Sequence, residues 1–138
     1  GIIVLGGGIS TGGGIAAAQA LGADLAAMGT RFIPTRESLA SDGYRDMLVA
    51  STIDDLVLSR GITGVPANWL RPSIEAAGMD LAKLEADVVI DFTDPKGDAR
   101  RWTQTWSAGH GVGSIKKVES ASELIADLSA QYAGARRA

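Results

Sequence analysis

Cysteine is absent from this sequence of 138 residues, and histidine occurs once, at position 110. Without cysteine there is no disulfide framework, no thiol nucleophile and no cysteine-ligated zinc or iron–sulfur site. Basic residues are not in excess either, because 13 Lys and Arg stand against 16 Asp and Glu, for a net charge of -3. Nucleic-acid-binding surfaces usually show a basic excess, so that class is not expected. A reducing, cytoplasmic setting fits these absences.

Long hydrophobic runs are also missing. No apolar stretch approaches the roughly 18 residues of a membrane-spanning helix, and no signal peptide is expected. Hydrophobic residues still make up 46% of the chain and charged residues 21%, which is enough apolar material for a buried core in one domain. Gly1 runs directly into the apolar residues 2–5. We therefore expect that a missing N-terminal part of the protein precedes this sequence.

The first thirty residues predict one βαβ unit. Residues 2–5 form a short apolar run, typical of a buried parallel strand, which stops at a glycine turn. Residues 15–21 place apolar side chains at helical spacing, and Gly22 is the expected C-cap. Residues 25–28 form a second apolar run that ends at Gly29 and Thr30. A right-handed parallel connection between the two strands is expected.

The glycine turn after the first strand predicts an anion site. Gly6, Gly7 and Gly8 expose backbone N–H groups, and the following helix is expected to point its positive end at the same place. Side chains would obstruct the approach of a phosphate, which favours glycine. Gly29 and Thr30 add further N–H groups and a hydroxyl. Two adjacent strand ends holding one phosphate are typical of the site after strands seven and eight of a TIM barrel.

Two other interpretations of this turn stay open. Glycines also occur where a strand only has to turn sharply. A Rossmann dinucleotide site needs the pattern G-x-G-x-x-G, but Thr11 stands where the third glycine belongs. Asp24 lies before the second strand instead of at its end, where a ribose-binding acid belongs. The Rossmann interpretation is therefore weak.

The rest of the chain predicts mainly helices and loops. A helix capped by Thr35 is expected to carry Leu39, Tyr44, Met47 and Leu48 on one face. Further expected elements are an extended segment at 56–58, a loop at 61–72, a helix at 73–85, a strand at 88–92, a turn at 94–97, a helix with Trp102 and Trp106, and a glycine-rich loop at 107–113.

A closing amphipathic helix is expected at the C-terminus. Ser120 and Glu123 form its capping box. Its predicted buried stripe consists of Leu124, Ile125, Leu128 and Tyr132.

The acidic pairs and tryptophans are expected to have structural roles. Asp54 with Asp55, and Asp91 with Asp94, could form paired carboxylates. Neither pair has a histidine at metal-ligand spacing, so capping and turn roles are favoured and no metal site is expected. Trp102 and Trp106 are expected in core or lid packing.

Three ordered stretches carry a resemblance to a known family. Residues 7–32, G-G-I-S-T-G-G-G-I-A-A-A-Q-A-L-G-A-D-L-A-A-M-G-T-R-F, resemble without a gap the region of the seventh and eighth strands in nitronate monooxygenases. The pieces T-R-E-S at 35–38 and I-T-G-V-P-A-N-W-L-R-P-S at 62–73 are also similar. W-S-A-G-H-G-V-G-S-I at 106–115 resembles the family's A-G-Q-G-V-G loop. Flavin-containing enoyl-acyl carrier protein reductases share the G-G-I and M-G-T-R-F pieces.

The resemblance implies an α/β fold, an FMN-binding TIM (β/α)8 barrel. Residues 1–34 would supply its last strands, seven and eight, and residues 35–138 a helical extension and closing segment of the same domain. By resemblance, Gly7 and Gly8 contact the FMN phosphate from one strand end. From the next strand end the contacts are expected at Ala27, Met28, Gly29 and Thr30.

The sequence departs from the family pattern at several positions. His110 stands where the family usually has Gln, and Ser10 and Thr11 replace the common Ala-Asp. The histidine that serves as base in the family lies before the seventh strand, outside this chain. We expect His110 to line the flavin pocket without being the essential base, although an imidazole that titrates near neutrality could tune proton transfer.

The resemblance implies a flavin-dependent oxidoreductase that oxidises alkyl nitronates with molecular oxygen through FMN. Its partners would be the nitronate, oxygen and the missing N-terminal part of the barrel, with no nucleic acid and no membrane. An FMN-dependent enoyl-acyl carrier protein reductase, which needs NADH, is one alternative. A non-catalytic flavin- or phosphate-binding module is the other.

Overall fold

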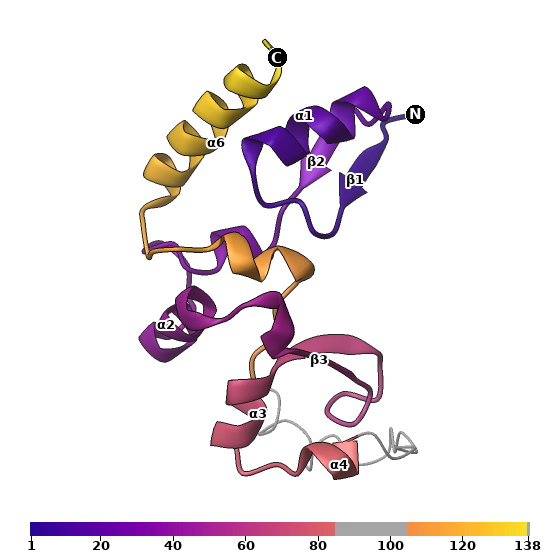
Figure 1. Ribbon diagram of the computed structural model, residues 1–138, viewed down its shortest axis with the longest axis vertical. Helices are drawn as coiled ribbons and strands as arrows, with labels where there is room; N and C mark the ends of the chain where they lie inside the picture. The colour runs from indigo at the N-terminus through magenta and orange to yellow at the C-terminus, as the bar shows by residue number, and fades with distance from the viewer. Residues whose placement is uncertain (85–104, 138) are drawn as a thin grey trace. The chain divides into compact units, whose positions relative to one another are not determined.

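A computed structural model describes residues 1–84 and 105–137. The predicted strand at 88–92, the turn at 94–97 and Trp102 lie outside the described residues. The chain divides into two compact units. Unit 1 consists of Gly1–Ala50 and Gly109–Ala138, and unit 2 of Ser51–Ala108 (Figure 1). In the described part of the chain, no helix is long and apolar enough to cross a membrane.

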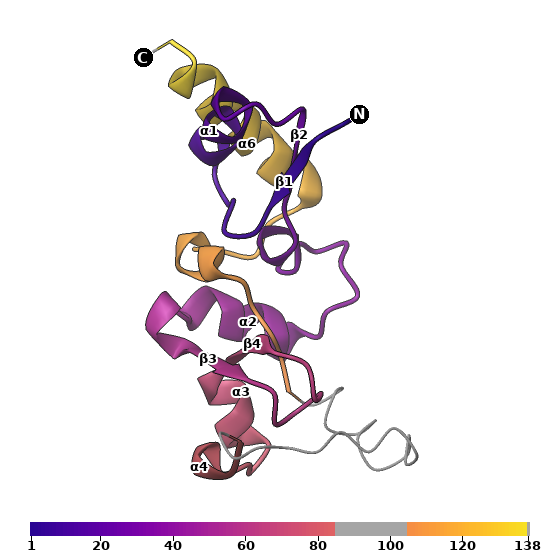
Figure 2. The same cartoon turned by 90° about the vertical axis from the view of Figure 1, so that its right-hand side faces the viewer.

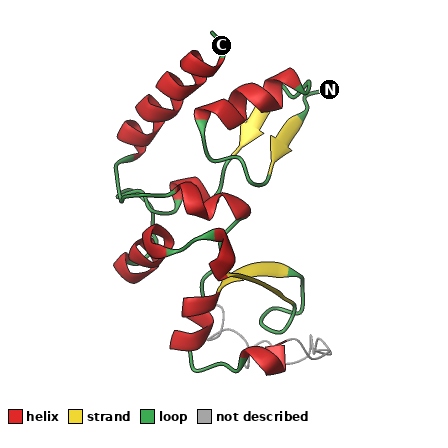
Figure 3. Cartoon of the chain, in the orientation of Figure 1, coloured by secondary structure: helices red, strands yellow, loops and turns green. Residues whose placement is uncertain are grey.

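Unit 1 begins with the βαβ unit that the sequence predicts. Strand β1 (Val4–Gly6) leads to helix α1 (Gly12–Ala20) and then to strand β2 (Leu25–Ala27). The two strands pair in parallel, with Val4 opposite Leu25 and Gly6 opposite Ala27 (Figure 3). The strand–helix–strand order is confirmed, with β1 beginning two residues later than expected, but the residues of β1 are exposed instead of buried. Both strands therefore end at the same edge of the sheet.

Thr11 caps the start of helix α1, and Gly22 follows its end. The Thr11 side chain accepts a hydrogen bond from the N–H of Gly14 at 3.1 Å. Gly22 has φ +96°, a left-handed conformation that glycine adopts without strain, and it stops the helix as predicted. The helix therefore includes the glycines at 12–14, which the sequence had suggested lie before it.

Helix α6 (Ala121–Ala135) packs beside α1 (Figures 1 and 2). A Cβ at Gly12 would collide with the backbone of Leu128 and Tyr132 and lie 2.6 Å from Gln131 Cβ. The N–H of Gly12 donates to Gln131 Oε1 at 2.9 Å. The close approach of the two helices thus requires glycine at position 12.

The capping box of α6 is confirmed. Ser120 Oγ accepts from the N–H of Glu123 at 3.1 Å, and the carboxylate of Glu123 accepts from the N–H of Ser120 at 2.7 Å. Leu124 and Leu128 are buried as predicted, but Ile125 is exposed. The buried stripe is therefore narrower than the sequence suggests.

The rest of unit 1 contains α2 (Asp42–Ala50) and two short 3-10 helices, η1 (Thr30–Phe32) and η3 (His110–Ser114). The predicted helix start at Thr35 is wrong. The Thr35 hydroxyl instead donates to the carbonyl of Phe32 at 2.9 Å and closes the turn after η1. Ser41 precedes α2 and accepts from the N–H of Tyr44 at 3.3 Å.

Unit 2 is built on an antiparallel hairpin. Strand β3 (Leu56–Ser59) pairs with β4 (Ala67–Leu70), so that Leu56 faces Leu70 and Ser59 faces Ala67. The loop expected at 61–72 is wrong in its second half. The indole of Trp69 is buried in a cluster with Ile62, Ile74 and Leu84, and this burial fixes the segment as a strand.

Two short helices close the cluster of unit 2. They are α3 (Arg71–Ala76) and α4 (Leu81–Leu84), and a short 3-10 helix, η2 (Ile53–Asp55), precedes the hairpin. The continuous helix expected at 73–85 is therefore broken. Gly78, with φ +67°, lies between the two helices. A left-handed residue cannot continue an α-helix, so the chain turns there.

Candidate functional site

A small pocket lies where β1 and β2 end, entirely within unit 1. Its volume is about 110 Å³. Pockets that enclose a drug-sized ligand measure roughly 300–1,000 Å³, so this one fits a single small group instead. The residues that line it are Gly7, Gly8, Ile9, Ser10, Ala27, Gly29, Thr30, Arg31, Gly109 and Gly111.

The turn after β1 needs glycine for its backbone conformation. Gly7 and Gly8 have φ values of +90° and +70°, which L side chains rarely adopt. An added Cβ at either position would find no heavy atom within 4 Å. The protein itself therefore leaves space beside these two residues. The positive φ values are thus a second reason for glycine at these positions, in addition to the predicted close approach of a phosphate.

The segment around Gly111 closes one wall of the pocket. A Cβ at Gly111 would lie 2.8 Å from Ser10 Cβ and 3.3 Å from the carbonyl oxygen of Gly8. Such distances force the neighbouring backbone to move. Glycine at position 111 thus allows the two loops, 100 residues apart in sequence, to touch.

Thr30 links the second strand end to the same segment. The N–H of Gly109 donates to Thr30 Oγ1 at 2.8 Å. A hydroxyl carries one proton, and accepting this bond leaves that proton available for another acceptor. Thr30 can therefore donate to an anion in the pocket while its oxygen is held by the protein.

The N-terminus of α1 does not contribute in the way that the sequence suggests. None of the residues of α1 lines the pocket. The N–H of Gly12 is bound by Gln131, and the N–H of Gly14 is bound by Thr11. These side chains satisfy two of the free N–H groups at the helix start. The donors around the pocket come from the loops instead.

The structure brings together five of the seven residues singled out from the sequence: Gly7, Gly8, Ala27, Gly29 and Thr30. Met28 lines a separate apolar groove with Ala26 and Phe32, because successive side chains on a strand point to opposite faces. His110 has an exposed side chain and does not line the small pocket, although both of its neighbours do. Its place beside a flavin ring stays a prediction.

Five lining residues had not been singled out as ligands: Ile9, Ser10, Arg31, Gly109 and Gly111. The two glycines lie in the loop predicted at 107–113, but the sequence does not indicate that this loop lies near the turn after β1. Among the described residues, Arg31 is the only charged one in the lining. No local pattern marks it, because its partner, Glu119, lies 88 residues further along the chain.

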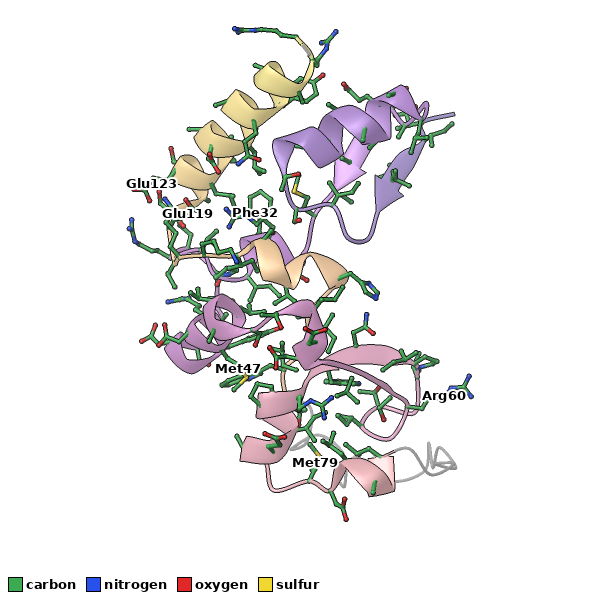
Figure 4. The ribbon with its side chains drawn as sticks, in the orientation of Figure 1. Phe32, Met47, Arg60, Met79, Glu119 and Glu123 are labelled. Carbon is green, nitrogen blue, oxygen red and sulfur yellow. The ribbon has the colours of Figure 1, made fainter. Side chains whose placement is uncertain are left out.

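Arg31 and Glu119 form a buried ion pair. Arg31 is 8% exposed and Glu119 2%. Arg31 Nη2 lies 2.9 Å from Glu119 Oε1, and Lys117 Nζ lies 3.1 Å from Glu119 Oε2. Figure 4 shows Glu119 just before α6, with Glu123 on the first turn of the helix. Two cations thus flank one buried carboxylate.

The cations keep Glu119 ionised. Burial alone would raise the pKa of the carboxyl, because it disfavours the charged form. Hydrogen bonds from Lys117 and Arg31, and the charges of both, outweigh burial and lower the pKa below its ordinary value of 4.5. The cluster therefore carries two positive charges and one negative charge at neutral pH.

Asp54 and Asp55 have the structural role that the sequence favours. The carboxylate of Asp55 accepts from the N–H of Thr52 at 2.7 Å and forms a capping box for η2. Asp91 and Asp94 lie outside the described residues. Within residues 1–84 and 105–137, no group of three or more acidic, histidine or cysteine side chains could hold a metal ion.

The pocket fits a phosphate group by two observations. Its glycine turn leaves open space beside Gly7 and Gly8. In addition, Arg31 Nη1 is buried and has no hydrogen-bond partner among the described residues. Buried donors are nearly always satisfied, so this nitrogen calls for an acceptor that the described residues do not supply.

Several known proteins are similar in sequence to this chain. The sequence profile of the family described as nitronate monooxygenase matches residues 2–131. A Mycobacterium tuberculosis protein that is named a monooxygenase is 32% identical, over 94% of this chain and 38% of that protein. A nitronate monooxygenase of Paraburkholderia phytofirmans is 37% identical, over 56% of this chain and 21% of that protein.

Solved structures show the same relation. FabK from Thermotoga maritima aligns with a TM-score of 0.72 and 29% identity, covering 99% of this chain and 45% of that protein. Nitroalkane oxidase from Streptomyces ansochromogenes aligns with a TM-score of 0.71 and 32% identity, covering 99% of this chain and 40% of that protein. The chain thus spans less than half the length of each of these relatives.

Proposed function

Because the chain belongs to the nitronate monooxygenase family, we propose that it forms the phosphate-binding part of an FMN-dependent (β/α)8 barrel. In this proposal β1 and β2 are strands seven and eight, and the complete polypeptide oxidises alkyl nitronates with molecular oxygen. The observation that carries the proposal is the convergence of two parallel strand ends and the segment at 109–111 on one small pocket. Phosphate sites of TIM barrels lie at this position.

In the proposed complex, each residue has a definite task. The backbone N–H groups of Gly7, Gly8 and Gly29 donate to the phosphate, and the Thr30 hydroxyl adds one more donor. FMN, when bound, would supply the redox chemistry between nitronate and oxygen. The residues described here anchor and orient it, and the base that takes up the substrate proton is proposed to lie outside this chain.

Binding is tested by replacing Gly8 with valine in the complete polypeptide. A β-branched residue at φ +70° strains the turn and fills the space beside it, so the purified protein should contain little or no flavin. Gly13→Ala is the matched control, because a Cβ there meets only Thr11 Oγ1, at 3.9 Å. Full flavin occupancy in the Gly8 variant would place the site elsewhere.

Activity is tested with a propyl nitronate and an oxygen electrode. We expect oxygen uptake without NADH. The similarity to FabK favours a second candidate, an FMN-dependent enoyl-acyl carrier protein reductase. That activity would appear as NADH oxidation on an enoyl substrate, with no nitronate turnover. Flavin binding without either reaction would indicate a non-catalytic module.

A further inference from the structure

We propose that Arg31 recognises the phosphate dianion through its Nη1 atom, and that Glu119 is the residue that positions its guanidinium. The inference rests on the proposed function, since it takes the pocket at the ends of β1 and β2 as the phosphate site. It assigns to the pocket a charged contact, which neutral N–H groups and a hydroxyl do not provide.

The two ends of the Arg31 guanidinium are in different situations. Nη2 donates to Glu119 Oε1 at 2.9 Å. Nη1 is buried but has no hydrogen-bond partner among residues 1–84 and 105–137. Arg31 lines the pocket, and no other charged residue in the described part of the chain does so. An arginine that is fixed at one nitrogen and unsatisfied at the other, beside a cavity, is suited to hold an anion.

Glu119 is itself held in place by the backbone. The N–H of Arg36 donates to its carbonyl oxygen at 3.0 Å, and Thr35 pairs with it as an isolated parallel bridge. Its carboxylate is therefore a fixed acceptor for Nη2. Lys117 neutralises the carboxylate from the other side at 3.1 Å. The charge of Arg31 is thus not cancelled by Glu119, and the cluster retains one net positive charge for a phosphate.

A purely structural ion pair makes a different prediction from a phosphate-binding arginine. If Arg31 only ties η1 to the segment before α6, its loss would weaken every flavin equally. If Nη1 binds phosphate, its loss would weaken FMN and leave riboflavin, which lacks the phosphate, unchanged. The ratio of the two affinities therefore separates the two roles.

The experiment measures FMN and riboflavin dissociation constants by flavin fluorescence, using the complete polypeptide stripped of flavin. Lysine keeps the charge but lacks the planar fork that lets one guanidinium present Nη2 to Glu119 and Nη1 to a phosphate. Arg31→Lys should therefore weaken FMN about 10- to 100-fold, the effect of one charge-assisted hydrogen bond, with riboflavin unchanged. Glu119→Gln should reduce the preference for FMN in the same direction but less.

Arg36→Lys is the matched control. Arg36 forms an exposed ion pair with Glu123 at 3.2 Å, five residues from Arg31, and it does not line the pocket. This variant should keep the wild-type ratio. Equal weakening of FMN and riboflavin binding in Arg31→Lys would overturn this inference and leave the proposed function standing. A wild-type protein that does not prefer FMN to riboflavin would instead remove the phosphate site, and with it the proposed function.

A second measurement needs no variant and applies even if Arg31→Lys fails to fold. The phosphorus NMR signal of FMN bound to the wild-type protein is followed as the pH is lowered. A phosphate monoester takes up its second proton near pH 6 in solution. A guanidinium in contact favours the dianion, so the bound phosphate should take up this proton at a lower pH than free FMN does. Titration of bound FMN at the same pH as free FMN would overturn the inference.

Discussion

The two compact units differ in how completely they bury their own strands. In unit 2, the hairpin β3–β4 covers one face with Ile62, Ile74 and Leu84, so that its Trp69 is buried. In unit 1, the parallel pair β1–β2 leaves much of its apolar surface open, with Val4 and Leu25 each 55% exposed. Antiparallel hairpins close locally, whereas parallel strands are normally buried on both faces by distant segments. The unit that holds the candidate site is thus the less self-sufficient of the two.

The largest expected effect comes from isolating the 138 residues. Without further strands, the exposed faces of β1 and β2 present free edges and apolar side chains. We expect the isolated chain to aggregate or to bind a hydrophobic dye, and to lack a cooperative melting transition. Size-exclusion chromatography and calorimetry test this. A monomer that melts cooperatively would show that unit 1 needs no cover.

Truncation of a core side chain in unit 2 should come next. Ile74 is fully buried beside Trp69, so Ile74→Ala should lower the free energy of unfolding by about 2–5 kcal/mol. Flavin affinity should change little as long as the variant is folded, because none of the residues of unit 2 that the structure describes lines the pocket. Denaturant melts and flavin titrations in the complete polypeptide measure both. Loss of flavin from a folded variant would contradict the separation of the units.

A methyl group at Gly12 should affect the other unit. Gly12→Ala drives a Cβ into the backbone of α6, and overpacking of this kind costs about 1–3 kcal/mol. Because α6 follows directly after Glu119, flavin affinity should fall together with stability. The conservative control is again Gly13→Ala in the same helix. A Gly12 variant with unchanged stability would mean that the two helices separate without cost.

Acid should weaken unit 1 through Glu119. The pKa of this carboxyl is lowered in the folded protein, so its contribution is full above the unfolded value of about 4.5. The contribution is lost as the pH falls below 4.5 through the folded value. Glu119→Gln should therefore flatten the acid side of the stability curve, measured by melts between pH 3 and 7. An unchanged acid limb would show that the ion pair adds nothing.

The smallest effect is expected at His110. Its side chain is exposed, and glutamine offers a similar neutral donor. His110→Gln should therefore keep most of the activity of the complete polypeptide in the oxygen-uptake assay. An inactive variant that still holds flavin would assign proton transfer to His110 itself.

Local patterns predicted the elements whose causes are local. The βαβ unit, the stop at Gly22 and the capping box of Ser120 and Glu123 follow from neighbouring residues, and the structure has all three. The strand β4 was missed because it is specified by burial of Trp69, which depends on residues up to 15 positions away. Tertiary packing overrides local propensity in such segments.

The candidate site was partly predictable for the same reason. The end of each predicted strand indicated the residues that follow it, which are Gly7, Gly8, Gly29 and Thr30. Arg31 could not be recognised, because its burial and its unsatisfied nitrogen depend on Glu119 in a distant segment. The sequence also predicts that α1 points its positive end at the anion site. It does not indicate that Gln131 of α6 accepts a hydrogen bond from the N–H of Gly12.

The bond between Gly12 and Gln131 spans 119 positions of sequence, and it bears on the order in which the chain assembles. Unit 1 is discontinuous, with the whole of unit 2 inserted between its halves. During synthesis the first half must wait for the last helix, whereas unit 2 is complete earlier. Once Ala108 is tied to Asn68 within unit 2, the loop that remains to be closed is effectively shorter. Early folding of the insert would thus lower the entropic barrier to completing the pocket.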